Sequence, residues 1–501
     1  MAQTADPPGV RFGTPTGRWV LTASVLGSGI AALDATVVGI ALPTIGRDFH
    51  VGVDALQWVV NAYTLTLAGL LLLGGTLGDR NGRRRVFQIG VVWFALASLL
   101  CGLAPDANTL ILARALQGVG AALLTPGSLA LLEASFVPDD RSKAIGAWSG
   151  LGGVATAVGP FLGGWLISAV SWRLIFFINL PLATAVVLIA ARHVPESRAP
   201  AATGRLDVAG AVTVTGALVG LTYGLIEGPV LGWTSPAVLG SLAGGVVLFA
   251  LFLLVERRAA DPMLPLQVFA SRQFSAANAV TFVVYAALGG VLFLLPVVLQ
   301  EVSGYSPLQA GTALLPVTVI MLALSARSGA LAARIGPRLQ MTVGPLVIGA
   351  GLALFVRIGT GGGYLLEVLP AVLVFGFGLA INVAPLTSTA LAAAPAEHAG
   401  VASAINNDVA RAAGLIAVAV LRVAAGITGA DYLDRVALVH GFRVAVLIAA
   451  AFCVAGGVLA AAVIRNQPSP ASTAGPDRPH LHCALDAPPA TGPHTSGTLP
   501  A

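Results

Sequence analysis

An aspartate lies in the middle of an apolar run near the start of the chain. The stretch IAALDATVVGIALP surrounds Asp34 with Ile, Ala, Leu and Val. Acidic residues inside membrane spans are expensive to bury, and burial disfavours their charged form, so such a carboxyl can take up and release a proton. Two interpretations follow: Asp34 binds a coupling proton, or it is a structural acid that is paired only for folding.

Arg114 is the basic residue that we expect closest to Asp34. At 1.5 Å per helical residue, Asp34 lies about 13 Å and Arg114 about 10 Å from the same end of their helices. Asn61 and Tyr63, in the stretch WVVNAYTL, are expected at that level and could complete one polar layer. Arg114 either tunes Asp34 or merely locks two helices together. Asn61 and Tyr63 either line a substrate cavity or are interhelical hydrogen-bonding groups.

A second polar stretch, INNDVARAAG, lies near the end of the chain. The residues that we expect to line the cytoplasmic half of a substrate cavity are Asn406, Asn407, Asp408 and Arg411. Asp408 and Arg411 are three residues apart, which puts them on one helix face and allows a local ion pair. Asp408 is therefore either part of a stabilising pair or a second proton site.

These residues must be positioned by membrane-spanning helices. Of the 501 residues, 56% are hydrophobic and only 10% are charged, whereas soluble domains contain about 25% charged residues. A span needs roughly 20 mainly apolar residues, and runs of this length satisfy their backbone hydrogen bonds as helices. We predict fourteen spans, approximately over residues 20–42, 55–77, 86–104, 108–132, 144–168, 174–191, 208–226, 236–255, 275–300, 308–330, 339–356, 368–390, 400–424 and 443–464.

The charges of the loops predict the orientation of these spans. If residues 1–19 are cytoplasmic, the cytoplasmic segments hold eighteen Arg and Lys residues and the opposite side holds six. The positive-inside rule then places both termini in the cytoplasm, and we expect a multi-pass protein of the plasma membrane. Residues 466–501, rich in Pro, Ser, Thr and Ala, indicate a disordered cytoplasmic tail. This tail contains His480, His482 and His494, which we interpret as solvated residues rather than as a metal site.

Two loops of the chain match at one spacing. GTLGDRNGRRR begins at Gly75 and GALAARIGPRL at Gly329, and both contain G-x-L followed by Arg, Gly and Arg at the same offsets. Each follows an even-numbered span, which indicates two related halves, and repeated halves around a midplane site are a transporter architecture. We predict an all-α integral membrane protein of two six-helix bundles plus two extra helices. The predicted segments are 1–19, 20–192, 193–273 with extra helices at 208–226 and 236–255, 274–465 and 466–501.

Six motifs in order resemble those of the major facilitator superfamily, and in particular its fourteen-span drug:proton antiporters. GTLGDRNGRRR resembles the loop signature after span 2, LARALQGVGAA the span 4 signature, GAWSGLGGVATAVGPFLGG the span 5 antiporter signature and LDATVVGIALP the span 1 signature. WRLIFFINLP and LQEVSGYSPLQAGTALLP are also similar to that family. Gly39 replaces the usual Asn of the span 1 motif, and Ala155 replaces a Gly of the span 5 motif.

The resemblance implies proton-coupled export of small amphipathic drugs or antibiotics by alternating access, as in multidrug resistance. The implied partners are a small-molecule substrate, protons and the lipid bilayer. We expect a monomer that binds no nucleic acid, cofactor or metal. Gln117, in the span 4 motif, is expected in the substrate cavity. Uptake or facilitated transport of another small organic solute by the same fold is the alternative.

Two further motifs carry expected roles in the conformational change. The residues expected to form a cytoplasmic latch are Gly75, Asp79, Arg80, Gly82, Arg83 and Arg84, and the alternative is a basic loop that only fixes topology. The residues expected to act as a hinge or a tight seal are Gly146, Gly159, Pro160, Gly163 and Gly164. Proline removes a helix hydrogen bond and glycine permits close helix approach, so plain close packing is the alternative for that stretch.

The sequence contains no motif that is typical of other classes of membrane protein. The only lysine, Lys143, follows a serine, so the Gly-Lys pair of a Walker loop is absent. No His lies centrally in a predicted span, which argues against bis-His haem and HExxH protease sites. We therefore expect a transporter and not an enzyme or a receptor.

Overall fold

The structure, a computed structural model, describes residues 9–198, 206–359, 361, 363–393, 399–427 and 434–466. Regular secondary structure in these ranges is helical, apart from an isolated bridge between Val10 and Phe136. Beyond Asn466, the tail predicted to 501 lies outside the described residues, as do residues 1–8 of the N-terminal segment.

Thirteen helices within the described ranges are long and apolar enough to cross a membrane. They are α1 (Pro15–Phe49), α2 (Val53–Asn81), α3 (Arg83–Leu103), α4 (Ala107–Ser135), α6 with α7 (Leu174–Phe177, Asn179–His193), α8 (Val208–Leu231), α9 (Pro236–Arg258), α10 (Arg272–Glu301), α11 with α12 (Pro307–Ala313, Leu315–Ile335), α13 with η2 (Arg338–Leu354, Phe355–Arg357), η3 with α14 (Tyr364–Val368, Leu369–Ala392), α15 (Ala399–Ala424) and α16 (Arg435–Val463). A further helix of 32 residues, α5 (Pro138–Ala169), packs along α1 and brings the spans to the predicted number. The all-α membrane fold is thus confirmed.

Two predicted spans contain an internal break that proline explains, and one predicted span ends too early. The predicted span 308–330 is broken at Leu314, because Pro316 has no amide hydrogen for the carbonyl of Thr312. The predicted span 174–191 is broken at Ile178, where Pro181 removes the matching bond to Phe177. The helix predicted over 208–226 continues to Leu231 as α8.

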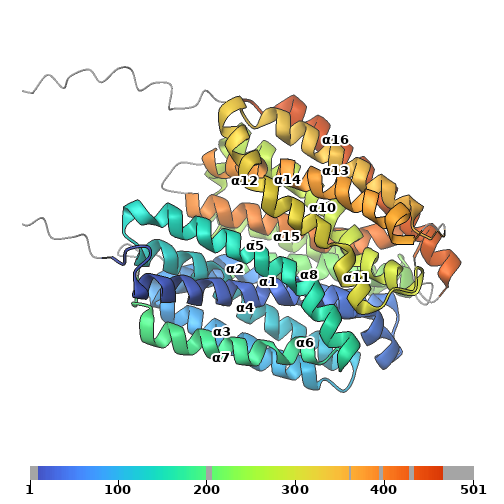
Figure 1. The fold of residues 1–501 in the computed structure, drawn as a ribbon, viewed down its shortest axis with the longest axis horizontal. Coiled ribbons are helices and arrows are strands. Elements are labelled where there is room, and N and C mark those ends of the chain that lie inside the picture. Colours follow the sequence, from blue (N-terminus) through green and yellow to red (C-terminus); the bar gives the residue numbers. More distant parts are fainter. Residues whose placement is uncertain are drawn as a thin grey trace, which may run out of the picture.

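The two halves of the chain repeat one packing scheme. In the first half, α1 packs on α5 and α7, while α4 packs on α2 and α3. In the second half, α10 packs on α15 and α16, while α14 packs on α12 and α13. Figure 1 shows these halves as two layers, blue to green below and yellow to red above. The extra helices α8 and α9 pack on each other, and α8 also contacts α2 and α15.

The helices run nearly parallel between two ends of the molecule (Figure 1). We call the end at which α1 begins and α16 ends the terminal end, and the opposite end the far end. The loop between α2 and α3 lies at the terminal end, and the start of α11 lies at the far end (Figure 1).

Polar caps mark several helix starts. Asp106, for example, accepts a hydrogen bond from Thr109 N at 2.9 Å, which satisfies a free amide at the start of α4.

Candidate functional site

Asp34 and Arg114 meet inside the first half as a buried ion pair. Arg114 Nη1 donates to Asp34 Oδ2 at 2.5 Å and to Gln117 Oε1 at 2.5 Å. Gln117 Nε2 donates to the other carboxylate oxygen, Oδ1 of Asp34, at 2.8 Å. The exposed fraction of Asp34 and Arg114 is 1%, and that of Gln117 is 0%. The structure therefore places Gln117, expected in the substrate cavity, within the Asp34 cluster.

Two polar residues that the sequence analysis missed complete this cluster. Ser98 Oγ on α3 accepts from Gln117 Nε2 at 2.7 Å and from Asn179 Nδ2 at 3.2 Å. Asn179 on α7 also donates to Asp34 Oδ1 at 3.4 Å. An amide in the apolar run FFINLP was the available signal for Asn179, whereas nothing distinguishes Ser98 from other serines in the spans. The cluster thus draws on α1, α3, α4 and α7.

Tyr63 contacts this cluster and also lines an open cavity. The guanidinium carbon of Arg114 lies 4.3 Å from the centre of the Tyr63 ring, a cation–π contact. Arg114 Nε donates to the carbonyl of Val59, one turn earlier on α2, at 3.1 Å. The Asn61 amide is buried and makes no hydrogen bond with described residues, so it does not join the polar layer.

A cavity of about 620 Å³ lies between the two halves on the other side of Tyr63. Small residues of α1, including Ala31 and Ala35, line it from the first half, and α2, α4 and α5 contribute further walls. From the second half, Asn407 and Arg411 of α15 line it, as the sequence predicts. Its lining extends to Asp79 at the terminal end. A volume of this size accommodates a drug-sized molecule.

The other two residues of the α15 motif have different surroundings. Asn406 is buried and donates to Asn278 Oδ1 at 3.1 Å and Thr281 Oγ1 at 2.9 Å on α10, away from the cavity. Asp408 forms no ion pair with Arg411 in the described chain, and its Oδ1 has no hydrogen-bond partner there. The local pair expected between these two residues is thus absent from this conformation.

The glycine motif of α5 divides its contacts between the two halves. Gly159 and Gly163 face Thr36 and Val37 of α1 within the first half. On the other side, a Cβ at Gly164 would lie 2.6 Å from the carbonyl oxygen of Pro307, at the start of α11.

Pro160 takes part in the contact between α5 and α11. A Cβ built on Gly311 would collide with the Pro160 carbonyl oxygen, so the two backbones touch directly. Gly146, near the terminal end of α5, has nothing within 4 Å of a built Cβ. The close contact between halves is therefore confined to the far-end part of the motif.

The far end is closed, whereas the cavity reaches the terminal end. Gln300 on α10 donates to the carbonyl of Ile40 on α1 at 2.9 Å, which joins the halves beside the α5–α11 contact. The cavity lining, by contrast, includes Asp79 at the end of α2 and Arg83 at the start of α3. This conformation therefore opens the cavity toward the terminal end.

The proposed latch residues lie around that opening. Asp79 Oδ1 accepts from Arg83 Nε at 2.7 Å, and Arg84 Nη1 donates to the carbonyl of Val194 at 3.0 Å. Gly82 joins α2 to α3 with a φ of 111°, a conformation that L side chains rarely adopt. Gly75 faces Pro126 of α4, and Arg80 is exposed.

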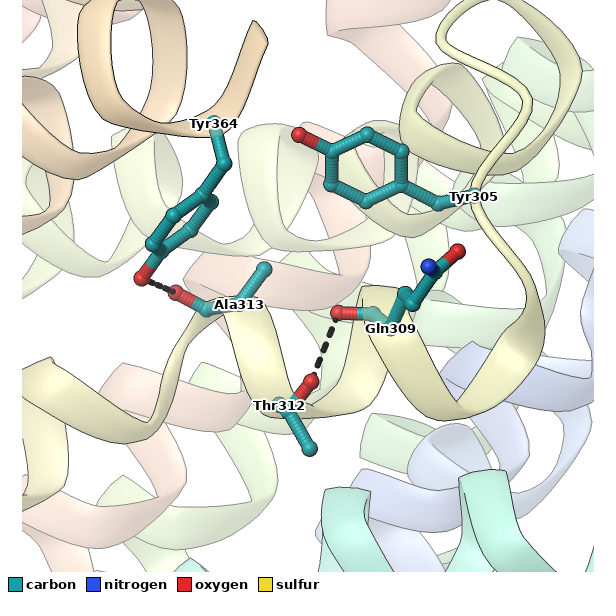
Figure 2. A pocket seen from close by; sticks show the side chains of 5 residues that line it. All are labelled: Tyr305, Gln309, Thr312, Ala313 and Tyr364. Carbon is teal, nitrogen blue, oxygen red and sulfur yellow. Dashed lines mark hydrogen bonds between the residues drawn. The ribbon is translucent and has the colours of Figure 1, made fainter.

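A second cavity, of about 440 Å³, lies at the far end beside α11. Figure 2 shows the rings of Tyr305 and Tyr364 on opposite sides of it, with Gln309, Thr312 and Ala313 below. Tyr364 Oη donates to the carbonyl of Ala313 at 3.2 Å. The helix α11 thus has the α5 contact on one side and this cavity on another.

Comparisons with known proteins agree with this architecture. The chain is 38% identical over 473 residues to the puromycin resistance protein pur8 of Streptomyces alboniger, covering 91% of this chain and 93% of that protein. It is 38% identical over 427 residues to the tetracenomycin C resistance and export protein of Streptomyces glaucescens, covering 84% and 79% of the two chains.

Solved structures show the same fold at low sequence identity. A peptide transporter POT in complex with sulfate aligns over 92% of this chain and 98% of its own, with a TM-score of 0.65 and 15% identity. The human organic anion transporter MFSD10 aligns over 89% and 100%, with a TM-score of 0.58 and 18% identity. The profile of the Major Facilitator Superfamily matches residues 24–419, and this chain, whose relatives are drug resistance and export proteins, belongs to that superfamily.

Proposed function

We propose that this protein exports small amphipathic drugs or antibiotics across the plasma membrane in exchange for protons. The names of its relatives, which describe resistance and export, support the direction and the class of substrate. The buried Asp34–Arg114 pair supports proton coupling, because acidic residues inside membrane spans are expensive to bury and usually mark functional sites such as proton relays. The 620 Å³ cavity between the halves supports the substrate site.

Tyr63 offers a direct link between the proton site and the cavity. Protonation of Asp34 removes the negative charge that holds Arg114 Nη1. Arg114 also rests on the Tyr63 ring, and that ring lines the cavity. A change at Asp34 therefore alters the wall that a substrate contacts, so that proton and substrate compete through Tyr63 without sharing a site.

In the proposed cycle the present conformation faces the cytoplasm. The positive-inside rule places the terminal end, with both chain termini, on the cytoplasmic side. Substrate enters the cavity there, and release requires α5 to separate from α11 at the far end while the halves close near Asp79. One half then rocks against the other around the midplane site, as repeated halves permit. We propose that one monomer performs this cycle.

The energy available sets a limit on the substrate gradient. One proton crossing ~150 mV yields ~3.5 kcal/mol, from ~2.3 kcal/mol per 100 mV. At 1.4 kcal/mol per factor of ten, that supports at most a ~300-fold gradient of a neutral substrate.

Transport in inverted membrane vesicles tests this function. Radiolabelled puromycin is the first probe, because a puromycin resistance protein is among the relatives. An acidic vesicle lumen should drive accumulation of the probe, and collapse of the pH gradient should abolish it. Vesicles from cells without the protein are the control. Accumulation that ignores the gradient, with equal flux in both directions, would favour the alternative, a facilitator of the same fold.

A further inference from the structure

Three helices meet at the far end and are joined pairwise by hydrogen bonds. Between α2 and α8, Trp58 Nε1 donates to Glu227 Oε1 at 2.9 Å. Between α2 and α15, Gln57 Nε2 donates to the carbonyl of Val418 at 2.5 Å.

The third side of this triangle joins α15 to α8. Arg422, one turn after Val418, donates from Nη2 to the carbonyl of Ile226 at 3.0 Å. The helix α2 belongs to the first half, α15 to the second, and α8 to the extra pair. The extra helix therefore bridges the halves at the end that is closed.

Arg422 is a buried cation that forms no ion pair within the described chain. It is fully buried, and its Nε and Nη1 have no hydrogen-bond partner among the described residues. The carboxylates whose charges act on it are those of Asp54 and Glu227, and neither forms an ion pair with it in the described chain. A buried charge without a paired counter-ion is strongly unfavourable, so this conformation is destabilised at Arg422.

The hydrogen bond between Trp58 and Glu227 stabilises this conformation, in contrast to the buried charge of Arg422. The indole of Trp58 also contacts the ring of Tyr223 on α8, with centroids 6.2 Å apart, so α2 is attached to α8 by an aromatic contact as well as by the bond. When α8 stays with α15, separation of α2 from α15 at the far end breaks this attachment. It also opens the interface in which Arg422 is buried, and allows the guanidinium to reach water or a carboxylate.

We propose that α8 is a clasp that sets the balance between the far-end-closed and far-end-open conformations. Trp58 and Glu227 stabilise the closed conformation, and the buried charge of Arg422 opposes it. Because these two contributions to the free energy have opposite signs, the closed conformation is favoured only slightly and the open conformation stays accessible. The role of the clasp in transport rests on the proposed function. The equilibrium between the two conformations, however, exists in the protein without substrate and can be measured there.

Distance measurements between spin labels test the clasp without any transport assay. Val170 and Val436 are exposed by 72% and 78% and lie at the far end of the first and second halves. Both are replaced by Cys and labelled, with Cys483 replaced by Ser, while the native Cys101 and Cys453 are buried. Double electron–electron resonance on the purified full chain in nanodiscs then gives the populations of short and long distances.

The variants are chosen to shift this balance in opposite directions. Trp58→Phe removes one hydrogen bond and should raise the ratio of long to short distances by roughly 2- to 10-fold. Glu227→Gln keeps an acceptor for Trp58 but removes a charge that offsets Arg422, so it should shift the ratio the same way. In the Trp58→Phe background, Arg422→Met removes the buried cation and should reverse the shift by roughly 10-fold or more.

Matched controls separate the clasp from general damage. Trp233→Phe changes a half-exposed indole on the α8–α9 turn, and Arg435→Met removes an exposed far-end arginine. Both should leave the ratio unchanged. A shift in the same direction for Trp58→Phe and the added Arg422→Met, or no shift in either, overturns the clasp. Failure of puromycin transport, with these distance shifts intact, would reject only the proposed function.

Discussion

Arg114 Nη1 donates a hydrogen bond to Asp34 Oδ2 at 2.5 Å, and both side chains are almost completely buried. The Tyr63 ring contacts Arg114 and lines the cavity, whereas neither Asp34 nor Arg114 is among the residues that line it. In the proposed function, a proton at Asp34 and a drug in the cavity act on each other through the Tyr63 ring, so the two sides of that ring can be tested separately.

Neutralising Asp34 should remove proton coupling while the protein stays folded. Asp34→Asn leaves the Arg114 guanidinium without its counter-ion and should lower the stability, but the amide oxygen can still accept a hydrogen bond from Arg114 Nη1, so the variant should insert and still bind substrate. It should fail to accumulate puromycin in acid-loaded inverted vesicles, whereas Asp34→Glu should retain partial activity with a shifted pH optimum. Asp106→Asn, which keeps a good cap for α4, is the control.

The competing role of Asp34, an acid needed only for folding, makes a different prediction. It expects Asp34→Asn to be scarce in the membrane. Full-rate, pH-dependent transport by a well-expressed Asp34→Asn would falsify the proton role and direct attention to Asp408.

Removing Arg114 should destabilise the protein more than removing both charges. Arg114→Gln leaves the buried carboxylate of Asp34 unpaired, at a cost of about 3–5 kcal/mol. The double variant Asp34→Asn with Arg114→Gln leaves no lone charge and should recover much of that loss. Thermal unfolding in detergent, analysed as a double-mutant cycle, measures the coupling. Additive losses would show that the ion pair contributes nothing.

The α5–α11 contact should not tolerate a methyl group. A Cβ at Gly164 would lie within 3 Å of Pro307 and Leu308, so Gly164→Ala should oppose far-end closure. Inserting a methyl into such a contact costs about 1–3 kcal/mol, which is a shift of roughly 5- to 100-fold toward the far-end-open conformation. The labelled pair at Val170 and Val436 reports that shift. Gly146→Ala, which meets nothing within 4 Å, should change nothing.

Pro160 should matter for coupling more than for assembly. Its carbonyl oxygen is in direct contact with Gly311, and Pro160→Ala restores an amide hydrogen that can straighten α5. The variant should reach the membrane at a normal level but export puromycin less efficiently. Normal export at normal abundance would leave only a packing role.

The orientation of the helices has a direct chemical test. A cysteine at Ser303, in the far-end loop after α10, should react with a membrane-impermeant maleimide added to intact cells. A cysteine at Asn81, at the end of α2, should react only after the membrane is permeabilised. Labelling of both sites from outside would contradict the fourteen-span topology.

The sequence by itself determined that this chain is a bundle of membrane-spanning helices in two related halves. Apolar runs of about 20 residues must satisfy their own backbone in lipid, so their length alone specifies helices. The repeat at Gly75 and Gly329 predicted the shared packing scheme, and one buried acid in span 1 was enough to identify Asp34 as a candidate site.

Only the tertiary structure decided which side chains meet. Lipid-facing and protein-facing sides of a span are both apolar, so composition does not reveal how a helix is rotated about its axis. For this reason the sequence does not reveal that Gln117 and Asn406 lie outside the cavity lining, or that Ser98 contacts Gln117. The same ambiguity hid the meeting of Trp58, Glu227 and Arg422, which come from three helices distant in the chain. Which end of the transporter is closed depends on contacts between the halves, such as that of Pro160 with Gly311, and no local pattern encodes such a contact.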